Sequence, residues 1–163
     1  MIGLSYIMAV VVGVIFLIAD QLTKYIVIQN MPLNSTKEFL PGFMNFHYIH
    51  NEGGAWGFLE GYTWILLSLT VIIMVVCVVM LFKSSSKSKV LFWAVSLIIS
   101  GGIGNMIDRV FRNGKVIDFL NCEFIDFPVF NVADCAVVIG AGLLILYFIL
   151  DTVREARQKK EEQ

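Results

Sequence analysis

Charged side chains are scarce in this chain of 163 residues: they make up 15% of it, against about a quarter of an ordinary soluble domain. Hydrophobic residues make up 58%, and the mean hydropathy is +0.79. The uncharged residues are clustered, in unbroken runs over 1–19, 61–82, 90–107 and 135–150. This pattern excludes an ordinary soluble domain and indicates a protein that resides in lipid.

The small numbers of basic residues, cysteines and histidines argue against further kinds of binding site. The net charge is −1 and no basic stripe lies outside the loops, so we expect no nucleic-acid partner. The cysteines, Cys77, Cys122 and Cys135, are odd in number and lack metal-ligand spacing. The only histidines, His47 and His50, are too few to complete a zinc site by themselves. We therefore expect no metal site.

The long apolar runs predict an all-α membrane bundle. About 20 apolar residues span a bilayer as a helix. We predict four transmembrane helices in a single domain over 1–163, at about 4–27, 62–82, 90–108 and 132–151. The first run lacks a basic start and is too long for a signal peptide, so we expect a retained helix.

Basic residues predict the orientation of these helices. They gather in the loop 83–89 and in the tail 152–163, as Lys83, Lys87, Lys89, Arg154, Arg157, Lys159 and Lys160. Positive charge favours the cytoplasmic side, so we expect both termini inside and the segments 28–61 and 109–131 outside. The expected location is a cell membrane, crossed several times.

The outer segments carry strand and turn signals. The stretch "FMNFHYIHN" alternates aromatic and polar residues, and Pro32, Pro41 and Gly42 mark turns nearby. The second segment has an Asn-Gly turn signal at 113–114, followed by a short β-like run. The aromatic content suits a small sheet at the membrane interface.

Ionisable and amide residues mark the ends of three predicted spans, where each is costly in hydrocarbon. On the third span, small and polar residues share one helical stripe. By the predicted topology, all of them fall toward the outer half of the membrane. The set is Asp20 and Lys24; Gly101, Gly104, Asn105, Asp108 and Arg109; Asp118; and Asn131 and Asp134.

Each of these residues also has a structural interpretation. Asn131 and Asp134 have the spacing of a capping box. The "GGIG" run suits close helix packing. Asp20 and Lys24, four residues apart, suit a structural ion pair, and Asp108 suits a solvated helix end.

Asp118 and Asp134 are the strongest candidates for chemistry. Asp118 in "VIDF" has apolar neighbours, and burial there would raise its pKa. Two carboxylates sharing a proton can activate a water, and a spacing of sixteen residues permits the two to meet. From the residues alone, an aspartyl hydrolase, an ion-coupled carrier and an assembly protein all remain open.

The chain resembles the bacterial lipoprotein signal peptidases (signal peptidase II) over essentially its full length, and in particular those of Gram-positive bacteria such as staphylococci. Five ordered motifs carry the resemblance: "DQLTK", "NEGGAWG", "GGIGNMIDR", "VIDF" and "FNVADC". One departure is visible, because Gly54, Ala55 and Trp56 stand where many members have Ala-Phe after the Asn-x-Gly motif.

The resemblance implies a membrane aspartyl endopeptidase that cleaves diacylglyceryl-modified prolipoproteins just before the lipid-modified cysteine. It implies four transmembrane helices with a small extracytoplasmic β-cradle and a capping loop, no metal or cofactor, a monomer, and inhibition by the cyclic peptide globomycin. The implied catalytic pair is Asp118 and Asp134. The residues implied to frame the site are Asp20, Lys24, Asn51, Gly53, Asn105, Asp108, Arg109 and Asn131.

Overall fold

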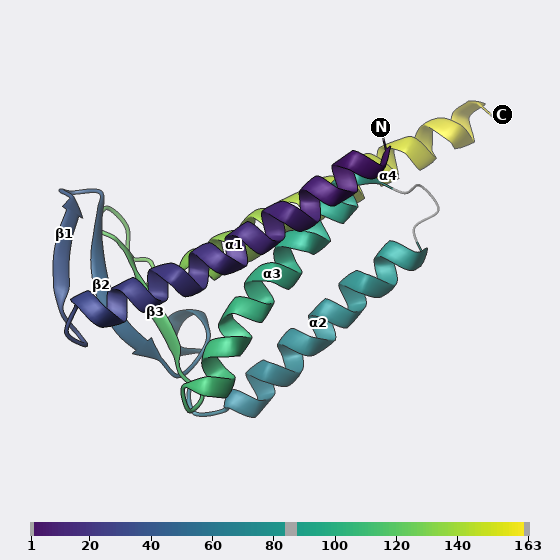
Figure 1. Ribbon diagram of the computed structural model, residues 1–163. Helices are drawn as coiled ribbons and strands as arrows, with labels where there is room; N and C mark the ends of the chain where they lie inside the picture. The colour runs from purple at the N-terminus through teal and green to yellow at the C-terminus, as the bar shows by residue number, and fades with distance from the viewer. Residues whose placement is uncertain (1, 84–87, 162–163) are drawn as a thin grey trace.

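The computed structural model describes residues 2–83 and 88–161, and in this part of the chain four long helices carry a three-stranded sheet at one end (Figure 1). The helices are α1 (Ile2–Asn30), α2 (Thr63–Lys83), α3 (Lys89–Phe111) and α4 (Val132–Glu161). All four are long and apolar enough to cross a membrane. The prediction of four helices able to span a membrane is therefore confirmed, whereas residues 84–87 of the loop, including Lys87, lie outside the described residues.

Local sequence signals explain where the helices end. Pro32 disfavours a helical conformation at Met31, and α1 ends at Asn30. Ser88 caps α3, its side chain accepting a hydrogen bond from the Leu91 N–H. At the other end of α3, Asn113 and Gly114 both have positive φ, and the Gly114 N–H donates back to the Arg109 carbonyl.

Helix α4 is longer than predicted. The predicted span stops at residue 151, but the helix continues to Glu161 and projects past the N-terminus of α1 (Figure 1). The extension is rich in Glu, Ala, Arg, Gln and Lys, which are good helix formers, and it contains no glycine or proline. The hydrophobic pattern marks where the apolar part ends, not where the helix ends.

The sheet consists of β1 (Thr36–Leu40), β2 (Met44–Asn51) and β3 (Val116–Cys122), antiparallel in that order. The alternating stretch 43–51 and the run after Asn113-Gly114 form β2 and β3 as predicted. Strand β1 was not predicted. It is short and exposed along its whole length, with no buried face to produce an alternating pattern.

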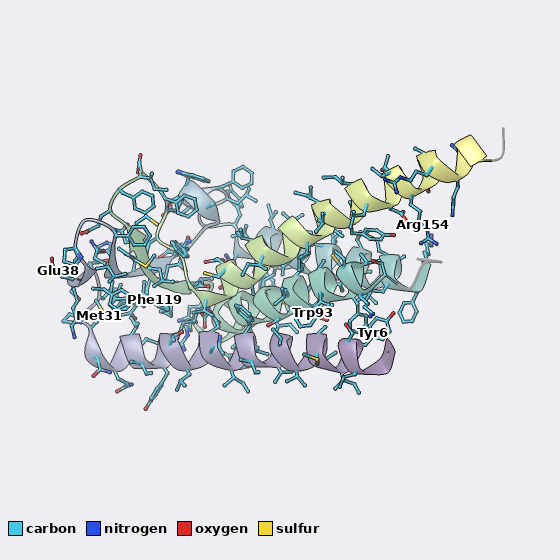
Figure 2. All side chains as sticks on the ribbon, turned by 90° about the horizontal axis from the view of Figure 1, so that it is seen from above. Tyr6, Met31, Glu38, Trp93, Phe119 and Arg154 are labelled. Atoms are coloured by element: carbon cyan, nitrogen blue, oxygen red, sulfur yellow. The ribbon has the colours of Figure 1, made fainter. Side chains whose placement is uncertain are left out.

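Helix α3 packs against each of the other three helices. The sheet is held to the end of the bundle by a small apolar core, in which Val27 of α1 packs with Tyr48 of β2 and with Ile117 and Phe119 of β3. In Figure 2, Met31 and Phe119 lie together at this end, far from Tyr6 and Trp93. Strand β3, which carries Asp118, is thereby fixed against the helices.

Candidate active site

Two carboxylates from different elements meet where the sheet joins the bundle. Asp118 lies in the middle of β3, opposite Ile49 of β2, and only 1% of it is exposed. Asp134 lies in the first turn of α4 and is partly buried. The chain between them folds back along β3, since Phe130 pairs with Leu120. This pairing brings the start of α4 beside Asp118.

Amide groups hold both carboxylates. The side-chain amide of Asn131 donates to one oxygen of Asp118 at 2.6 Å, and that of Asn51 donates to the other at 2.8 Å. The Asn105 amide donates to Asp134 Oδ1 at 2.7 Å. No ion pair among the described residues involves either acid. Each carboxylate is therefore oriented without being neutralised by direct contact with a cation.

Asn131 and Asp134 also form the predicted capping box. The Asp134 N–H donates to Asn131 Oδ1, and the Asn131 N–H donates to Asp134 Oδ2, both at 3.0 Å. The capping interpretation is thus confirmed. It does not compete with a chemical role, because Asn131 is fully buried and uses its amide nitrogen on Asp118.

The pKa of Asp118 is raised to about 7, chiefly by burial and also by the neighbouring charge of Asp134. Hydrogen bonds from Asn51 and Asn131 and the charge of Lys24 oppose this shift. A carboxyl group with this pKa is partly protonated near neutral pH. That matches the expectation drawn from the apolar neighbours of Asp118 in the sequence.

Both carboxylates line one cavity of about 230 Å³. Its polar wall comes from α3, β2 and β3, and its apolar wall from the segment before α4 and from α4 itself. The lining residues are Asn51, Gly54, Ala55, Asn105, Arg109, Val116, Asp118, Phe127, Pro128, Val129, Phe130, Asp134, Val137 and Val138. A concave, largely apolar cavity with a few converging polar groups is typical of a ligand-binding site.

Behind this cavity lies a fully buried ion cluster. Lys24 Nζ is 2.9 Å from a carboxylate oxygen of Asp20 and 2.9 Å from one of Asp108, and all three side chains are 0% exposed. The predicted Asp20–Lys24 pair is confirmed. The interpretation of Asp108 as a solvated helix end is wrong, because Asp108 is buried and also accepts from Arg112 and from the Ile117 N–H.

Arg109 connects α3 to the loop that follows β2. Its guanidinium donates to the Gly53 carbonyl at 2.9 Å, and the Gly53 N–H donates to Asn51 Oδ1 at 2.8 Å. A Cβ atom at Gly53 would lie 2.9 Å from the Phe58 carbonyl oxygen, so the tight loop needs glycine there. All ten predicted site residues thus lie in one connected region, although their roles stay predictions.

The "GGIG" run packs as the structural interpretation predicted. A Cβ at Gly101 would collide with the Ala133 carbonyl and Val137 of α4. Gly102 faces Met74 and Thr70 of α2. Gly104 lies against Asp20 and Ala133, so small residues bring α1 and α4 together at the depth of the ion cluster.

The histidines, the cysteines and Trp56 are not among the residues that line the cavity. His47 bonds Thr36 and His50 bonds the Tyr48 hydroxyl, and the described residues hold no group of metal-ligating side chains. The three cysteines are free. Trp56 is 73% exposed on the short 3-10 turn η1 (Ala55–Gly57) and packs against Phe127.

Sequence reasoning missed two parts of the site. Gln21 bonds both Asp20 and the Gly104 carbonyl, and its position between two candidate residues in "DQLTK" was the available signal. The segment 127–130 forms the apolar wall of the cavity. Its sequence, Phe-Pro-Val-Phe, is unusually apolar for a loop, and this was the available signal. Only the fold shows that the segment lines the cavity of the two acids.

Comparison with known proteins identifies the family of this chain. A family model described as Signal peptidase (SPase) II matches residues 11–150. The chain belongs to the signal peptidase II family. It is therefore a peptidase, and its four candidate spans make it a multi-pass membrane protein.

Relatives in this family confirm the Gram-positive resemblance. The lipoprotein signal peptidase of Enterococcus faecalis is 44% identical over 81% of each chain. That of Staphylococcus aureus is 38% identical over 95% of this chain and 93% of its own length. A solved structure described as a bacterial membrane enzyme covers 89% of both chains, with a TM-score of 0.83 and 35% identity. The four-helix bundle with its small sheet is thus confirmed.

Proposed function

We propose that this signal peptidase II family member is an aspartyl endopeptidase that cleaves diacylglyceryl-modified prolipoproteins just before the lipid-modified cysteine. Membership of the family and the printed name of its relatives, lipoprotein signal peptidase, support the removal of signal peptides from prolipoproteins. The observation that carries the aspartyl mechanism is that Asp118 and Asp134, from β3 and α4, line a single cavity.

In the proposed reaction, the two carboxylates share one proton and hold a water between them. The ionised carboxylate takes a proton from the water as the water oxygen attacks the scissile carbonyl carbon. The protonated carboxyl gives its proton to the carbonyl oxygen, which forms a tetrahedral diol. As the C–N bond breaks, the protonated carboxyl gives its proton to the leaving nitrogen. The other carboxylate takes a proton from one diol hydroxyl, whose oxygen becomes the new carbonyl oxygen, so the dyad returns to its singly protonated state.

The surroundings of the acids support this chemistry. A pKa of about 7 for Asp118 keeps one proton available near neutral pH. Each carboxylate oxygen accepts one amide hydrogen bond, and a carboxylate oxygen has two lone pairs, so each retains capacity toward the cavity. The protons of such a pair titrate as a unit. Two carboxylates are sufficient for this reaction, so the proposal includes no metal and no cofactor.

We assign framing roles to the other site residues. Asn51, Asn105 and Asn131 orient the carboxylates through the bonds given above. Arg109 and Gly53 shape the loop above the cavity, where a bound peptide would need partners for its own carbonyl groups. Asp20, Lys24 and Asp108 support the site from behind.

The proposed setting is the bacterial cell membrane, with both termini cytoplasmic and the cavity facing the outer leaflet, where a lipid-anchored substrate remains. The basic residues Lys83, Lys89 and Arg154 support this orientation. Exposed aromatics such as Phe43 and Trp64 suit an interfacial position for the sheet end. We further propose that the enzyme acts as a monomer and that globomycin-type cyclic peptides occupy the cavity.

The test is cleavage of a purified diacylglyceryl-modified prolipoprotein in detergent with chelator present, comparing wild type, Asp118→Asn and Asp134→Asn. Asparagine keeps the shape of the side chain and much of its capping capacity at 134. We expect wild-type cleavage and, in both folded variants, a loss of activity of at least about 1000-fold, as for other residues that perform the chemistry.

Normal cleavage by either folded variant would assign that residue a structural role and overturn the dyad. Absence of cleavage by wild type, combined with substrate flux in sealed vesicles, would instead indicate a carrier. If wild type showed neither cleavage nor flux, and a folded variant with both acids neutralised still supported the assembly of other membrane proteins, an assembly role would replace the proposed hydrolysis.

A further inference from the structure

The backbone N–H groups just before the two proposed catalytic acids are each held by a second, buried aspartate. The Ile117 N–H, immediately before Asp118, donates to Asp108 Oδ2 at 3.1 Å. The Ala133 N–H, immediately before Asp134, donates to Asp20 Oδ1 at 2.9 Å. Asp108 lies on α3 and Asp20 on α1, so two further helices position β3 and the start of α4.

A single ammonium group joins these two supporting aspartates. Lys24 Nζ lies 2.9 Å from Asp20 Oδ2 and 2.9 Å from Asp108 Oδ2. Its third contact, at 3.1 Å, is to Asn105 Oδ1, and the amide nitrogen of Asn105 bonds Asp134. An ammonium has three donors. Lys24 therefore uses all of them inside the protein, and none is left for a substrate.

We propose that Lys24 is a positioning residue, an inference that rests on the proposed function. By joining Asp20 to Asp108, Lys24 fixes the distance between Asp118 and Asp134. The connection runs from the backbone of β3 through Asp108, Lys24 and Asp20 to the backbone of α4. All three side chains are fully buried, so water does not compete for these contacts. Neither supporting aspartate is among the residues that line the cavity, so neither is assigned to the chemistry.

This arrangement has a consequence beyond packing, because Lys24 is also one of the charges that act on Asp118. The others are Asp134 on α4, which raises the pKa of Asp118, and Arg109 on α3, which attracts its ionised form. Loss of the Lys24 charge raises the pKa of Asp118 further. The high-pH limb of activity, where the dyad loses its shared proton, then moves to higher pH.

The experiment measures kcat, KM and the pH profile of purified folded enzyme on a diacylglyceryl-modified prolipoprotein, for wild type, Lys24→Met and Lys115→Met. Lys115 pairs with Glu52 at the partly exposed rim and serves as the matched control. We expect Lys24→Met to lower kcat by about 10- to 100-fold, because small misplacements of reacting groups have effects of this size. KM should stay within about twofold, since binding groups are untouched, and the high-pH limb should move upward. Lys115→Met should change none of these.

A second variant keeps the proposal testable if Lys24→Met does not fold because it leaves unpaired buried charge. The triple variant Lys24→Met with Asp20→Asn and Asp108→Asn has no such charge, and its amide oxygens still accept the two backbone N–H groups. We expect it to fold, with the same loss of kcat. Wild-type kcat in folded Lys24→Met, or in the triple variant, would overturn the positioning role. That outcome would leave the proposed function intact, whereas absence of cleavage by wild type would overturn the function itself.

Discussion

At the scale of single residues, Asp118 combines features that stability alone would not favour. It is an acid buried on β3, at the edge of the sheet, and two neutral amides, Asn51 and Asn131, are its hydrogen-bond partners. Its pKa is raised to about 7 by burial first and by Asp134 second. A buried carboxyl without a paired cation lowers stability once it ionises. This is the kind of local cost that functional sites carry.

The cost of Asp118 should appear in the pH dependence of stability. The folded state holds the proton up to about pH 7, whereas the ordinary carboxyl pKa is 3.8. Folding therefore binds a proton, and the stability present below the ordinary pKa is progressively lost as the pH rises toward 7. Asp118→Asn removes this loss, which is on the order of a few kcal/mol.

We expect the melting temperature of Asp118→Asn minus that of wild type to increase between pH 5 and pH 8, by roughly several degrees. Thermal unfolding in detergent followed by intrinsic fluorescence measures this difference. Asp126→Asn, at an exposed carboxylate in the segment before α4, is the matched control and should show a flat difference. A flat difference for Asp118→Asn as well would mean that Asp118 is not desolvated in solution.

At the scale of elements, the packing of α3 against α4 depends on glycines that allow the backbones to approach. A Cβ at Gly140 would lie 2.8 Å from the Ala94 carbonyl oxygen and 2.8 Å from Ile98 Cγ1, both on α3. Two residues further along the same helix, a Cβ at Gly142 would meet nothing within 4 Å. The same substitution at the two positions therefore separates packing from helix propensity.

Gly140→Ala should destabilise the fold by about 1–3 kcal/mol, because the added methyl group forces the two helices apart. Gly142→Ala should stabilise the fold by up to about 1 kcal/mol, because alanine has the higher helix propensity and its methyl group meets no neighbour. Unfolding of both variants by denaturant in mixed micelles, beside wild type, measures the two effects. Equal stability of the two variants would show that the contact between α3 and α4 accommodates the methyl group.

At the scale of the whole molecule, polarity is distributed unevenly along the bundle. The sheet lies at one end and the basic extension of α4 at the other (Figure 1). The buried ions and the cavity belong to the sheet end, since Asp108 bonds β3 and the cavity is lined by residues of β2 and β3. A bundle that spans a membrane with these two ends must place the cavity on one side. The distribution of lysine and arginine predicts that this is the outer side.

Cysteine labelling tests this orientation. In a background lacking Cys77, Cys122 and Cys135, a cysteine at Lys37 of β1 should react with a membrane-impermeant maleimide in intact cells. A cysteine at Arg157 of α4 should react only after permeabilisation. Both positions are exposed, so access to the thiol is not limited by folding. The reverse labelling pattern would contradict the predicted orientation, and with it the placement of the cavity at the outer leaflet.

The sequence by itself determined the features that depend on neighbouring residues. Unbroken apolar runs specified four spanning helices, because backbone groups in lipid must be satisfied within each segment. Alternation specified β2, the Asn-Gly pair specified the turn before β3, and the spacing of Asn131 and Asp134 specified a helix cap. The motif resemblance predicted the family and selected the acids, whose roles stay predictions.

Only the tertiary structure decided which distant groups meet. Lys24 contacts Asn105, which is 81 residues away in the sequence. The pairing of Leu120 with Phe130 brings Asp134 to the cavity that Asp118 lines. Asp108, beside an arginine at a helix end, is indistinguishable in sequence from a solvated acid, yet it is fully buried. Periodicity and capping act over a few residues, whereas burial and ion pairing depend on elements packed from the whole chain.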